Sequence, residues 1–323
     1  MFNIAIIGAG NIATMHTTAY QKMKDVRIKT IVDVDVERAK IMAENVDCKA
    51  TANIDEVLHD PEIEAVDICL PNFLHLETVM KAAEAGKHII CEKPAALTVE
   101  DAEKMFDICR KNNVVLYIAQ VCRFMTAYQE IHHVLEEKDV GDPKLVRLSR
   151  SVHYPMLVGQ EWYKDESKSG GLFLDFVIHD LDFIVWNFGK PEIISSQLIS
   201  EEKLKGIIIN LKVDGGPMIT VNGVWTSIDQ GGLHQRVEID GTNGFVHYDN
   251  RNELPFVFKN TSGKSRMLSK ETLCNDPFYR ELRHFINCFR GTEQPLITDK
   301  EVIQTLETAI EAREIAREKG LNE

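Results

Sequence analysis

The sequence predicts an α/β protein in which a doubly wound parallel sheet is followed by an α+β domain with antiparallel strands. Short apolar runs alternate with helical patterns as far as about residue 121, and a glycine-rich turn follows the first run. Beyond residue 122, hairpin-type turns join the apolar runs instead. These two rhythms predict two domains, residues 1–121 and residues 122–323.

The first domain is predicted to consist of βαβ units, because short apolar runs are separated by segments with helical periodicity. The expected strands are Phe2–Ile7, Val26–Val32, Ala65–Leu70, His88–Cys91 and Val114–Ala119. The expected helices are Ile12–Lys24, Val36–Asn45, Leu74–Ala85 and Val99–Lys111. Crossovers between parallel strands are right-handed, so the helices should cover both faces of the sheet.

The second domain is predicted to be antiparallel, because the tetrapeptides DGGP (214–217) and GTNG (241–244) separate apolar strands as hairpin turns do. The expected strands are Leu145–His153, Ile207–Val213, Met218–Thr226, Arg236–Asp240 and Phe245–Tyr248. The expected helices are Leu172–Phe188, which Gly189 ends, Phe278–Phe289 and Asp299–Glu318. The last of these helices could pack back on the first domain.

Composition excludes several classes of function. With 37 Lys+Arg against 50 Asp+Glu, the net charge of −13 disfavours a nucleic-acid-binding protein, which needs a basic face. No apolar run is long enough to span a bilayer, and the N-terminus lacks the pattern of a secretory signal, so we expect a cytoplasmic protein. The seven cysteines contain no C-x-x-C pair, which favours buried thiols over a disulfide framework or a metal site.

The first predicted strand runs into the turn GAGNIA, from Gly8 to Ala13, which opens a helix. Gly8 permits the tight turn, Gly10 lets backbone amides approach a pyrophosphate, and the small Ala13 lets the helix pack on the strand. Asn11 and Ile12 lie at the helix N-terminus, whose positive dipole favours phosphates. The pattern predicts a dinucleotide site.

Asp33 follows the second predicted strand, 20 residues beyond Ala13, where a carboxylate can accept hydrogen bonds from the adenosine ribose. The same carboxylate would repel a 2′-phosphate, so the sequence favours NAD over NADP. Arg38 is evidence against that preference, because its guanidinium could bind the phosphate. Asp33 could instead serve only as the cap of the next helix.

One segment, GKHIICEKP from Gly86 to Pro94, ends a predicted strand in Glu-Lys-Pro. Further motifs follow a fixed order along the chain: PNFLH (71–75), RF (123–124), GGLFLD (170–175), HDLD (179–182) and DPFYREL (276–282). Together these motifs resemble the Gfo/Idh/MocA family of oxidoreductases, which includes glucose–fructose oxidoreductase and inositol dehydrogenase. The resemblance covers nearly the whole chain.

The resemblance implies an N-terminal Rossmann domain and a C-terminal domain with a large open antiparallel sheet. That sheet commonly forms the oligomer interface, so a homodimer or homotetramer is expected. A cyclic sugar or polyol is implied as the substrate, with the nicotinamide held between the domains. The peptide bond between Lys93 and Pro94 is often cis in relatives.

The chemistry can also be argued from the residues. Oxidation of a secondary alcohol needs a proton acceptor and a group that stabilises the developing alkoxide. Lys93 ends a predicted parallel strand, where α/β sheets bind ligands, and its ammonium can donate to the substrate oxygen. Asp175 and His179 are four residues apart on one predicted helix, so they should share a face.

We assign His179 as the general acid/base and Asp175 as the residue that orients Lys93 or His179. Two structural interpretations remain open at this point. Asp175 and His179 could form a helix-face hydrogen bond alone, and Lys93 could be a surface lysine.

Relatives line the nicotinamide ribose with residues that follow the fourth strand, which implies that Leu70, Asn72 and His75 contact the cofactor together with Glu92 and Lys93. His75 could equally be a helix N-terminal residue that faces solvent.

Arg123 and Trp162 are candidate substrate residues, Arg123 because its guanidinium can donate in a fork to hydroxyls or a carboxylate. Trp162 could instead be ordinary packing between domains. The loops 151–171 and 225–236 are expected to determine the substrate.

Three functions compete. The first is an NAD-dependent dehydrogenase that acts on a sugar, inositol or related polyol. The second is a glycosidase that oxidises its substrate transiently with bound NAD, and the third is a non-catalytic regulator that senses NAD. The presence of Lys93, Asp175 and His179 favours an enzyme.

Overall fold

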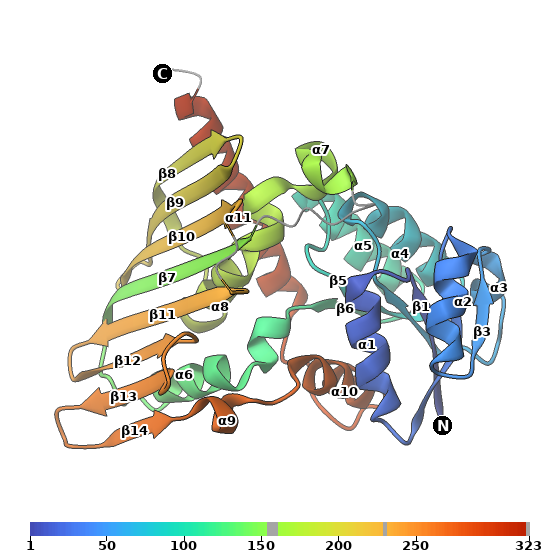
Figure 1. Ribbon diagram of the computed structural model, residues 1–323, viewed down its shortest axis with the longest axis horizontal. Coiled ribbons are helices and arrows are strands. Elements are labelled where there is room, and N and C mark those ends of the chain that lie inside the picture. The colour runs from blue at the N-terminus through green and yellow to red at the C-terminus, as the bar shows by residue number, and fades with distance from the viewer. Residues whose placement is uncertain (154–160, 229–230, 321–323) are drawn as a thin grey trace. The chain divides into compact units, whose positions relative to one another are not determined.

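The chain forms two compact units in the computed structural model (Figure 1). The described residues are 1–153, 161–228 and 231–320. The first unit comprises Met1–Phe124 and Asp276–Ile303, and the second comprises Met125–Asn275 and Gln304–Glu323. Each unit contains one sheet.

The first unit is built on a parallel six-stranded sheet of order β3-β2-β1-β4-β5-β6 (Figure 1). Its strands are β1 (Phe2–Ile7), β2 (Val26–Val32), β3 (Lys49–Thr51), β4 (Ala65–Ile68), β5 (His88–Glu92) and β6 (Leu116–Ala119). The order reverses between β1 and β4, which is the point where doubly wound sheets bind ligands. The predicted doubly wound fold is confirmed. Strand β3 is not predicted, because three residues are too short to show a period.

Helices connect these strands. They are α1 (Asn11–Gln21), α2 (Val36–Glu44), α3 (Asp55–Leu58), α4 (His75–Glu84), α5 (Val99–Lys111) and the 3-10 segments η1 (Asn72–Leu74) and η2 (Val121–Phe124). Of these, α1, α2, α4 and α5 lie where the apolar periodicity predicts them. The strands between them are almost wholly buried, as expected for a sheet covered on both faces.

One helix from beyond residue 122 packs in the first unit. Helix α10 (Pro277–Phe289) places the rings of Phe285 and Phe289 5.0 and 5.1 Å from that of Tyr117 on β6. The compact units therefore differ from a division into 1–121 and 122–323. An aromatic helix face predicts burial but does not show which sheet it covers.

The second unit is built on an eight-stranded sheet of order β14-β13-β12-β11-β7-β10-β9-β8. Its strands are β7 (Pro143–His153), β8 (Glu192–Glu201), β9 (Leu204–Lys212), β10 (Met218–Thr226), β11 (His234–Gly241), β12 (Gly244–Asp249), β13 (Phe256–Asn260) and β14 (Ser265–Leu268). All pairs are antiparallel except β7 with β10. The large antiparallel sheet is confirmed. Edge strand β8 is not predicted, since its centre, Ser-Ser-Gln, is polar.

The helical segments of the second unit, together with the C-terminal helix that begins in the first, complete the fold. They are α6 (Thr126–Glu136), η3 (Glu161–Lys164), α7 (Glu166–Ser169), the π segment η4 (Leu172–Phe176), α8 (Ile178–Phe188), α9 (Lys270–Leu273) and α11 (Asp299–Gly320).

The single helix predicted over Leu172–Phe188 is wrong in one respect, because it divides at Val177. The Val177 amide donates to the Leu172 carbonyl at 3.0 Å, five residues back, so the chain makes a wider π turn before α8 begins. Val177 packs against Gly223 of β10, because a Cβ added to Gly223 would lie 2.4 Å from the Cγ1 atom of Val177. Asp175 and His179 therefore do not lie four residues apart on one regular α-helix.

A buried ion pair joins α8 to the second sheet. The guanidinium of Arg150 on β7 donates from Nε and Nη2 to the two carboxylate oxygens of Asp180, at 2.9 and 3.1 Å. Arg150 is 2% exposed and Asp180 is 1% exposed. Because the pair is desolvated, each partner depends on the other for compensation of its charge.

We expect the Asp180→Ala variant to lower the free energy of unfolding by about 3–5 kcal/mol, because it leaves a buried guanidinium without its carboxylate. Urea unfolding followed by circular dichroism measures the change. The control is Asp240→Ala, which removes the partner of the half-exposed Arg147 on the same strand. That variant should lower the free energy of unfolding by less than about 1 kcal/mol. Equal losses of stability in the two variants would contradict the interpretation of Arg150 and Asp180 as a buried ion pair.

Candidate functional site

The glycine-rich turn lies between β1 and α1 and has the geometry of an anion site. Gly8 has φ +106°, and a Cβ there would lie 2.4 Å from the Cys69 carbonyl oxygen. Gly10 caps α1 without any side-chain hydrogen bond, and the first turn holds no acidic residue. The amides of a helix's first turn have no intrahelical partner, so those at Asn11 and Ile12 suit a pyrophosphate.

Asp33 lies at the end of β2, beside this turn. One carboxylate oxygen accepts from the Ala9 amide at 2.7 Å, and the other accepts from the Asp35 amide at 2.9 Å. The cap of α2 is Asp35, whose side chain accepts from the amides of Glu37 and Arg38, so the interpretation of Asp33 as that cap is wrong. Each Asp33 oxygen retains a second acceptor position, which fits a ribose hydroxyl.

Arg38 also contacts the turn. Its Nη2 atom donates to the Ala9 carbonyl at 3.1 Å and lies 3.9 Å from an Asp33 carboxylate oxygen. The side chain of Arg38 is 51% exposed, so the guanidinium remains available to a ligand. The positive charge next to Asp33 therefore reduces the repulsion that this carboxylate would exert on a 2′-phosphate.

The Glu-Lys-Pro segment ends β5 at the same carboxyl edge of the sheet. The peptide bond between Lys93 and Pro94 is cis, as the resemblance implied. Glu92 is buried and its carboxylate accepts from the Lys93 amide at 3.2 Å, whereas the Lys93 side chain is half-buried. Lys93 thus stands at the edge where the nucleotide turn also lies, and its catalytic role stays a prediction.

His75 is fully buried, so the solvent-facing interpretation is wrong. Its Nδ1 atom lies 2.9 Å from the Pro94 carbonyl oxygen, and its Nε2 atom lies 2.9 Å from the Leu70 carbonyl oxygen. Burial lowers the pKa of the imidazole, while the two carbonyl contacts oppose that shift. Because both nitrogens contact backbone, His75 joins two loops of the cofactor edge. Asn72 is buried beside it on η1.

Arg123 does not have the exposure of a substrate residue. Its side chain is 1% exposed, and Nη1 donates to the Leu296 carbonyl and to the Glu301 carboxylate, each at 3.2 Å. The guanidinium ties η2 to the start of α11 and to the segment before it, and a substrate role for Arg123 stays a prediction. Sequence alone could not reveal this, because the partner lies 178 residues away.

In the second unit, Asp175 receives a hydrogen bond from the hydroxyl of Tyr163. Asp175 is 9% exposed on η4, and His179 is half-buried on the first turn of α8. Sequence reasoning missed Tyr163, which lies next to the candidate Trp162 on η3. The centroids of the Trp162 and Tyr163 rings are 5.1 Å apart, and the Tyr163 ring lies 5.9 Å from that of Trp225. The predicted substrate role of Trp162 remains a prediction.

A cavity of about 610 Å³ adjoins this aromatic group at the ends of β7 and β10. Both loops that are predicted to determine the substrate, 151–171 and 225–236, contribute to it. The residues of these loops that line the cavity are His153, Lys164, Trp225 and Ser227. Residues 154–160 and 229–230 of the same loops lie outside the described part of the chain.

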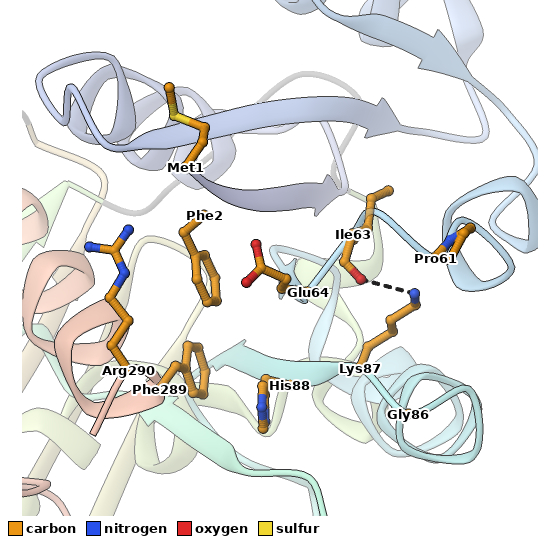
Figure 2. A pocket seen from close by; sticks show the side chains of 10 residues that line it. All are labelled: Met1, Phe2, Pro61, Ile63, Glu64, Gly86, Lys87, His88, Phe289 and Arg290. Atoms are coloured by element: carbon orange, nitrogen blue, oxygen red, sulfur yellow. Dashed lines mark hydrogen bonds between the residues drawn. The ribbon is translucent and has the colours of Figure 1, made fainter. Parts of the chain in front are cut away.

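A second cavity, of about 530 Å³, lies in the first unit (Figure 2). Phe2 and His88, which begin β1 and β5, line it together with Glu64, which precedes β4. The cavity is therefore at the amino edge of the parallel sheet, opposite the nucleotide turn. The Lys87 ammonium donates to the carbonyls of Asp60 and Ile63 at 2.6 and 2.9 Å, so it holds the chain before β4.

Comparison with known families agrees with this geometry. Residues 2–120 match the family described as "Oxidoreductase family, NAD-binding Rossmann fold", and residues 128–247 match the Gfo/Idh/MocA C-terminal domain. The chain belongs to the Gfo/Idh/MocA family. The resemblance carried by the Glu-Lys-Pro strand end is thereby confirmed, and the protein is an NAD-binding oxidoreductase of this family.

Similar proteins span nearly the whole chain. Myo-inositol 2-dehydrogenase of Thermotoga maritima is 28% identical over 98% of this chain and 96% of its own. The scyllo-inositol 2-dehydrogenase (NAD(+)) of Bacillus subtilis is 27% identical over 80% of this chain and 76% of its own. A levoglucosan dehydrogenase solved with NADH and L-sorbose has the same fold, with a TM-score of 0.87 and 22% identity, over 98% of this chain and 97% of its own.

Within the described residues, none of the helices combines the length and the apolar character that crossing a membrane requires.

We expect the Asp33→Ala variant to weaken NAD binding by about tenfold to a hundredfold, the equivalent of one hydrogen bond to a charged acceptor. Binding of NADP should weaken less, because that carboxylate repels the 2′-phosphate. Titration of intrinsic fluorescence with each cofactor measures both constants. The control is Asp35→Ala, which removes the cap of α2 and should change both affinities equally. If Asp33→Ala weakened NAD and NADP binding by the same factor, the assignment of Asp33 to the ribose would be contradicted.

Proposed function

We propose that this protein transfers a hydride between NAD and a secondary hydroxyl of a cyclic sugar, inositol or related polyol. The observation that carries the proposal is the position of Lys93, at the carboxyl edge of the sheet that holds the nucleotide turn. The nicotinamide, when bound, would be the hydride acceptor. The residues of this chain would bind the substrate and handle its proton.

Lys93 is proposed to donate a hydrogen bond from its ammonium to the reacting oxygen. A positive charge at that oxygen stabilises the alkoxide that develops as the hydride leaves. Two neighbours favour this role, since the Lys93 amide donates to Glu92 and the Pro94 carbonyl contacts His75. The backbone that carries the ammonium is thus held on both sides.

His179 is proposed to be the general acid/base that acts on the same hydroxyl. Asp175 is proposed to orient it or Lys93, and Tyr163, which donates to Asp175, would in turn orient that carboxylate. A positioned acid/base contributes about 10²–10⁴ in rate.

The substrate class rests on the relatives. The two named in the preceding section are inositol 2-dehydrogenases, and the myo-inositol enzyme matches 98% of this chain. The cavity at the ends of β7 and β10, with Trp225 and Lys164 in its lining, offers an apolar ring and a donor. Such a pair suits a hydroxylated ring, whose C–H face packs on an aromatic residue while its oxygens accept hydrogen bonds.

We expect the Lys93→Met variant to lower kcat by about 10²–10³-fold while NAD binding stays within about twofold, because only the donor to the alkoxide is lost. The assay follows NADH absorbance over a panel of inositols, hexoses and anhydrosugars with both cofactors. Lys81→Met, on the exposed face of α4, is the matched control and should keep full activity. Unchanged turnover in Lys93→Met would remove Lys93 from the reaction. Redox-neutral release of sugar would favour the glycosidase instead.

We further propose that two copies or four associate through the outer face of the second sheet. Strands β7 to β10 expose large apolar side chains on that face. They are Leu145, Ile194, Ile208 and Met218. Contiguous apolar residues of this kind usually mark an interface. Charged pairs such as Arg147 with Asp240 lie beside them and could fix the register of the copies.

We expect the Ile208→Asp variant to elute as a monomer in size-exclusion chromatography with light scattering, because a carboxylate on this face would be desolvated in the assembly. Ile41→Asp, on the exposed face of α2, is the control and should leave the wild-type mass unchanged. If the wild-type protein is itself a monomer, or if Ile208→Asp retains its mass, this face is not the interface.

A further inference from the structure

A buried polar cluster lies beneath the carboxyl edge of the first sheet. It consists of His16 on α1, Asp67 on β4 and Glu92 at the end of β5. His16 and Asp67 are fully buried, and Glu92 is 8% exposed. Tyr20 of α1 and Cys69, which follows β4, also contact the Asp67 carboxylate. Because the site is closed to solvent, its charges must compensate one another.

The imidazole of His16 lies between the two carboxylates. Its Nδ1 atom is 2.9 Å from an Asp67 oxygen, and its Nε2 atom is 3.2 Å from a Glu92 oxygen. The contact at Nδ1 has hydrogen-bond geometry, whereas the contact between Nε2 and Glu92 is an ion pair without that geometry, so it depends on a protonated ring. Burial lowers the pKa of His16, but the Asp67 carboxylate and its hydrogen bond outweigh that effect, so the pKa is raised well above its ordinary value.

Glu92 passes this restraint on to Lys93. One carboxylate oxygen faces His16, and the other accepts from the Lys93 amide at 3.2 Å. The contacts form a continuous path from Asp67 through His16 and Glu92 to the peptide bond that precedes the Lys93 side chain. His16 belongs to the helix that opens at the nucleotide turn, so the path also joins that turn to Lys93.

We propose that His16 is a positioning residue for the reaction, holding Glu92 and through it the backbone of Lys93 in the geometry that places the ammonium over bound substrate. The inference rests on the proposed function, because it assumes that Lys93 acts on the substrate. His16 touches neither cofactor nor reacting atoms in this role. It acts through Glu92.

If His16 had only a structural role, its substitution should have the same effects as substitution of its neighbour Tyr20. The Tyr20 hydroxyl donates to the same Asp67 oxygen at 2.9 Å, from the next turn of the same helix, and is equally buried. Among the described residues, His16 forms an ion pair with Glu92 and Tyr20 does not. The two residues share one anchor and differ in the second contact, which makes Tyr20→Phe the matched control.

The variant that tests the proposal is His16→Gln. Glutamine is neutral and cannot form the ion pair with Glu92, so the restraint on Glu92 should be lost. We expect kcat to fall by about a hundredfold, as for a reacting group displaced by about 1 Å, with NAD affinity unchanged within about twofold. Tyr20→Phe should lower the melting temperature and keep kcat within about twofold of wild type.

Hydrogen exchange of the Lys93 amide provides a readout that does not depend on turnover. In His16→Gln this amide should exchange at least about tenfold faster, while the amides of β1 keep their wild-type rates. Tyr20→Phe should leave the Lys93 amide unchanged. If His16→Gln does not fold, Glu92→Gln takes its place, since it weakens the same path from the other side and should show the same faster exchange.

Three results would overturn the inference: an unchanged Lys93 amide in His16→Gln, an equal loss of kcat in Tyr20→Phe, or loss of NAD binding in step with kcat. Failure of the proposed function gives a different pattern. In that case the wild-type protein turns over none of the panel. Hydrogen exchange of the Lys93 amide then still shows whether His16 restrains the Lys93 backbone.

Discussion

The close approach of Gly8 to the carbonyl of Cys69 is the constraint on which the first unit depends. A side chain at Gly8 would lie 2.4 Å from that oxygen, so only glycine lets β1 turn into α1 beside the end of β4. This contact closes the point where the strand order reverses. It brings the uncapped start of α1, the Asp33 carboxylate and the end of β5 to one edge, and every proposed role of that edge follows from it.

The two units contribute different physical properties. The first is a parallel sheet buried on both faces, with polar groups at its carboxyl edge and the buried Asp67 within β4. The second is a mostly antiparallel sheet with one face covered by α8 and anchored by the buried pair of Arg150 and Asp180. Its other face exposes apolar side chains. The first sheet thus carries the NAD-binding fold, while the substrate and association surfaces of the second sheet are proposals.

Much of the site was predictable where it depends on local chemistry. The glycine turn, Asp33 and the Glu-Lys-Pro strand end are contiguous motifs, and each lies where its spacing predicts. The burial of Arg123 and His75 could not be predicted, because their partners are carbonyls and a carboxylate distant in sequence. Tyr163 was missed since a tyrosine in a polar loop carries no periodic signal, and its link to Asp175 exists only once η3 and η4 pack together.

The sequence by itself determined the doubly wound fold, the dinucleotide turn and the family, because these depend on apolar periodicity and on short motifs read within a few residues. Tertiary structure alone decided that α10 completes the first core, that the helix after Gly171 opens as a π turn, and that His16 lies between Asp67 and Glu92. Those outcomes depend on which distant surfaces and charges meet, and the free energy of burying a charge is set by neighbours that linear order does not reveal.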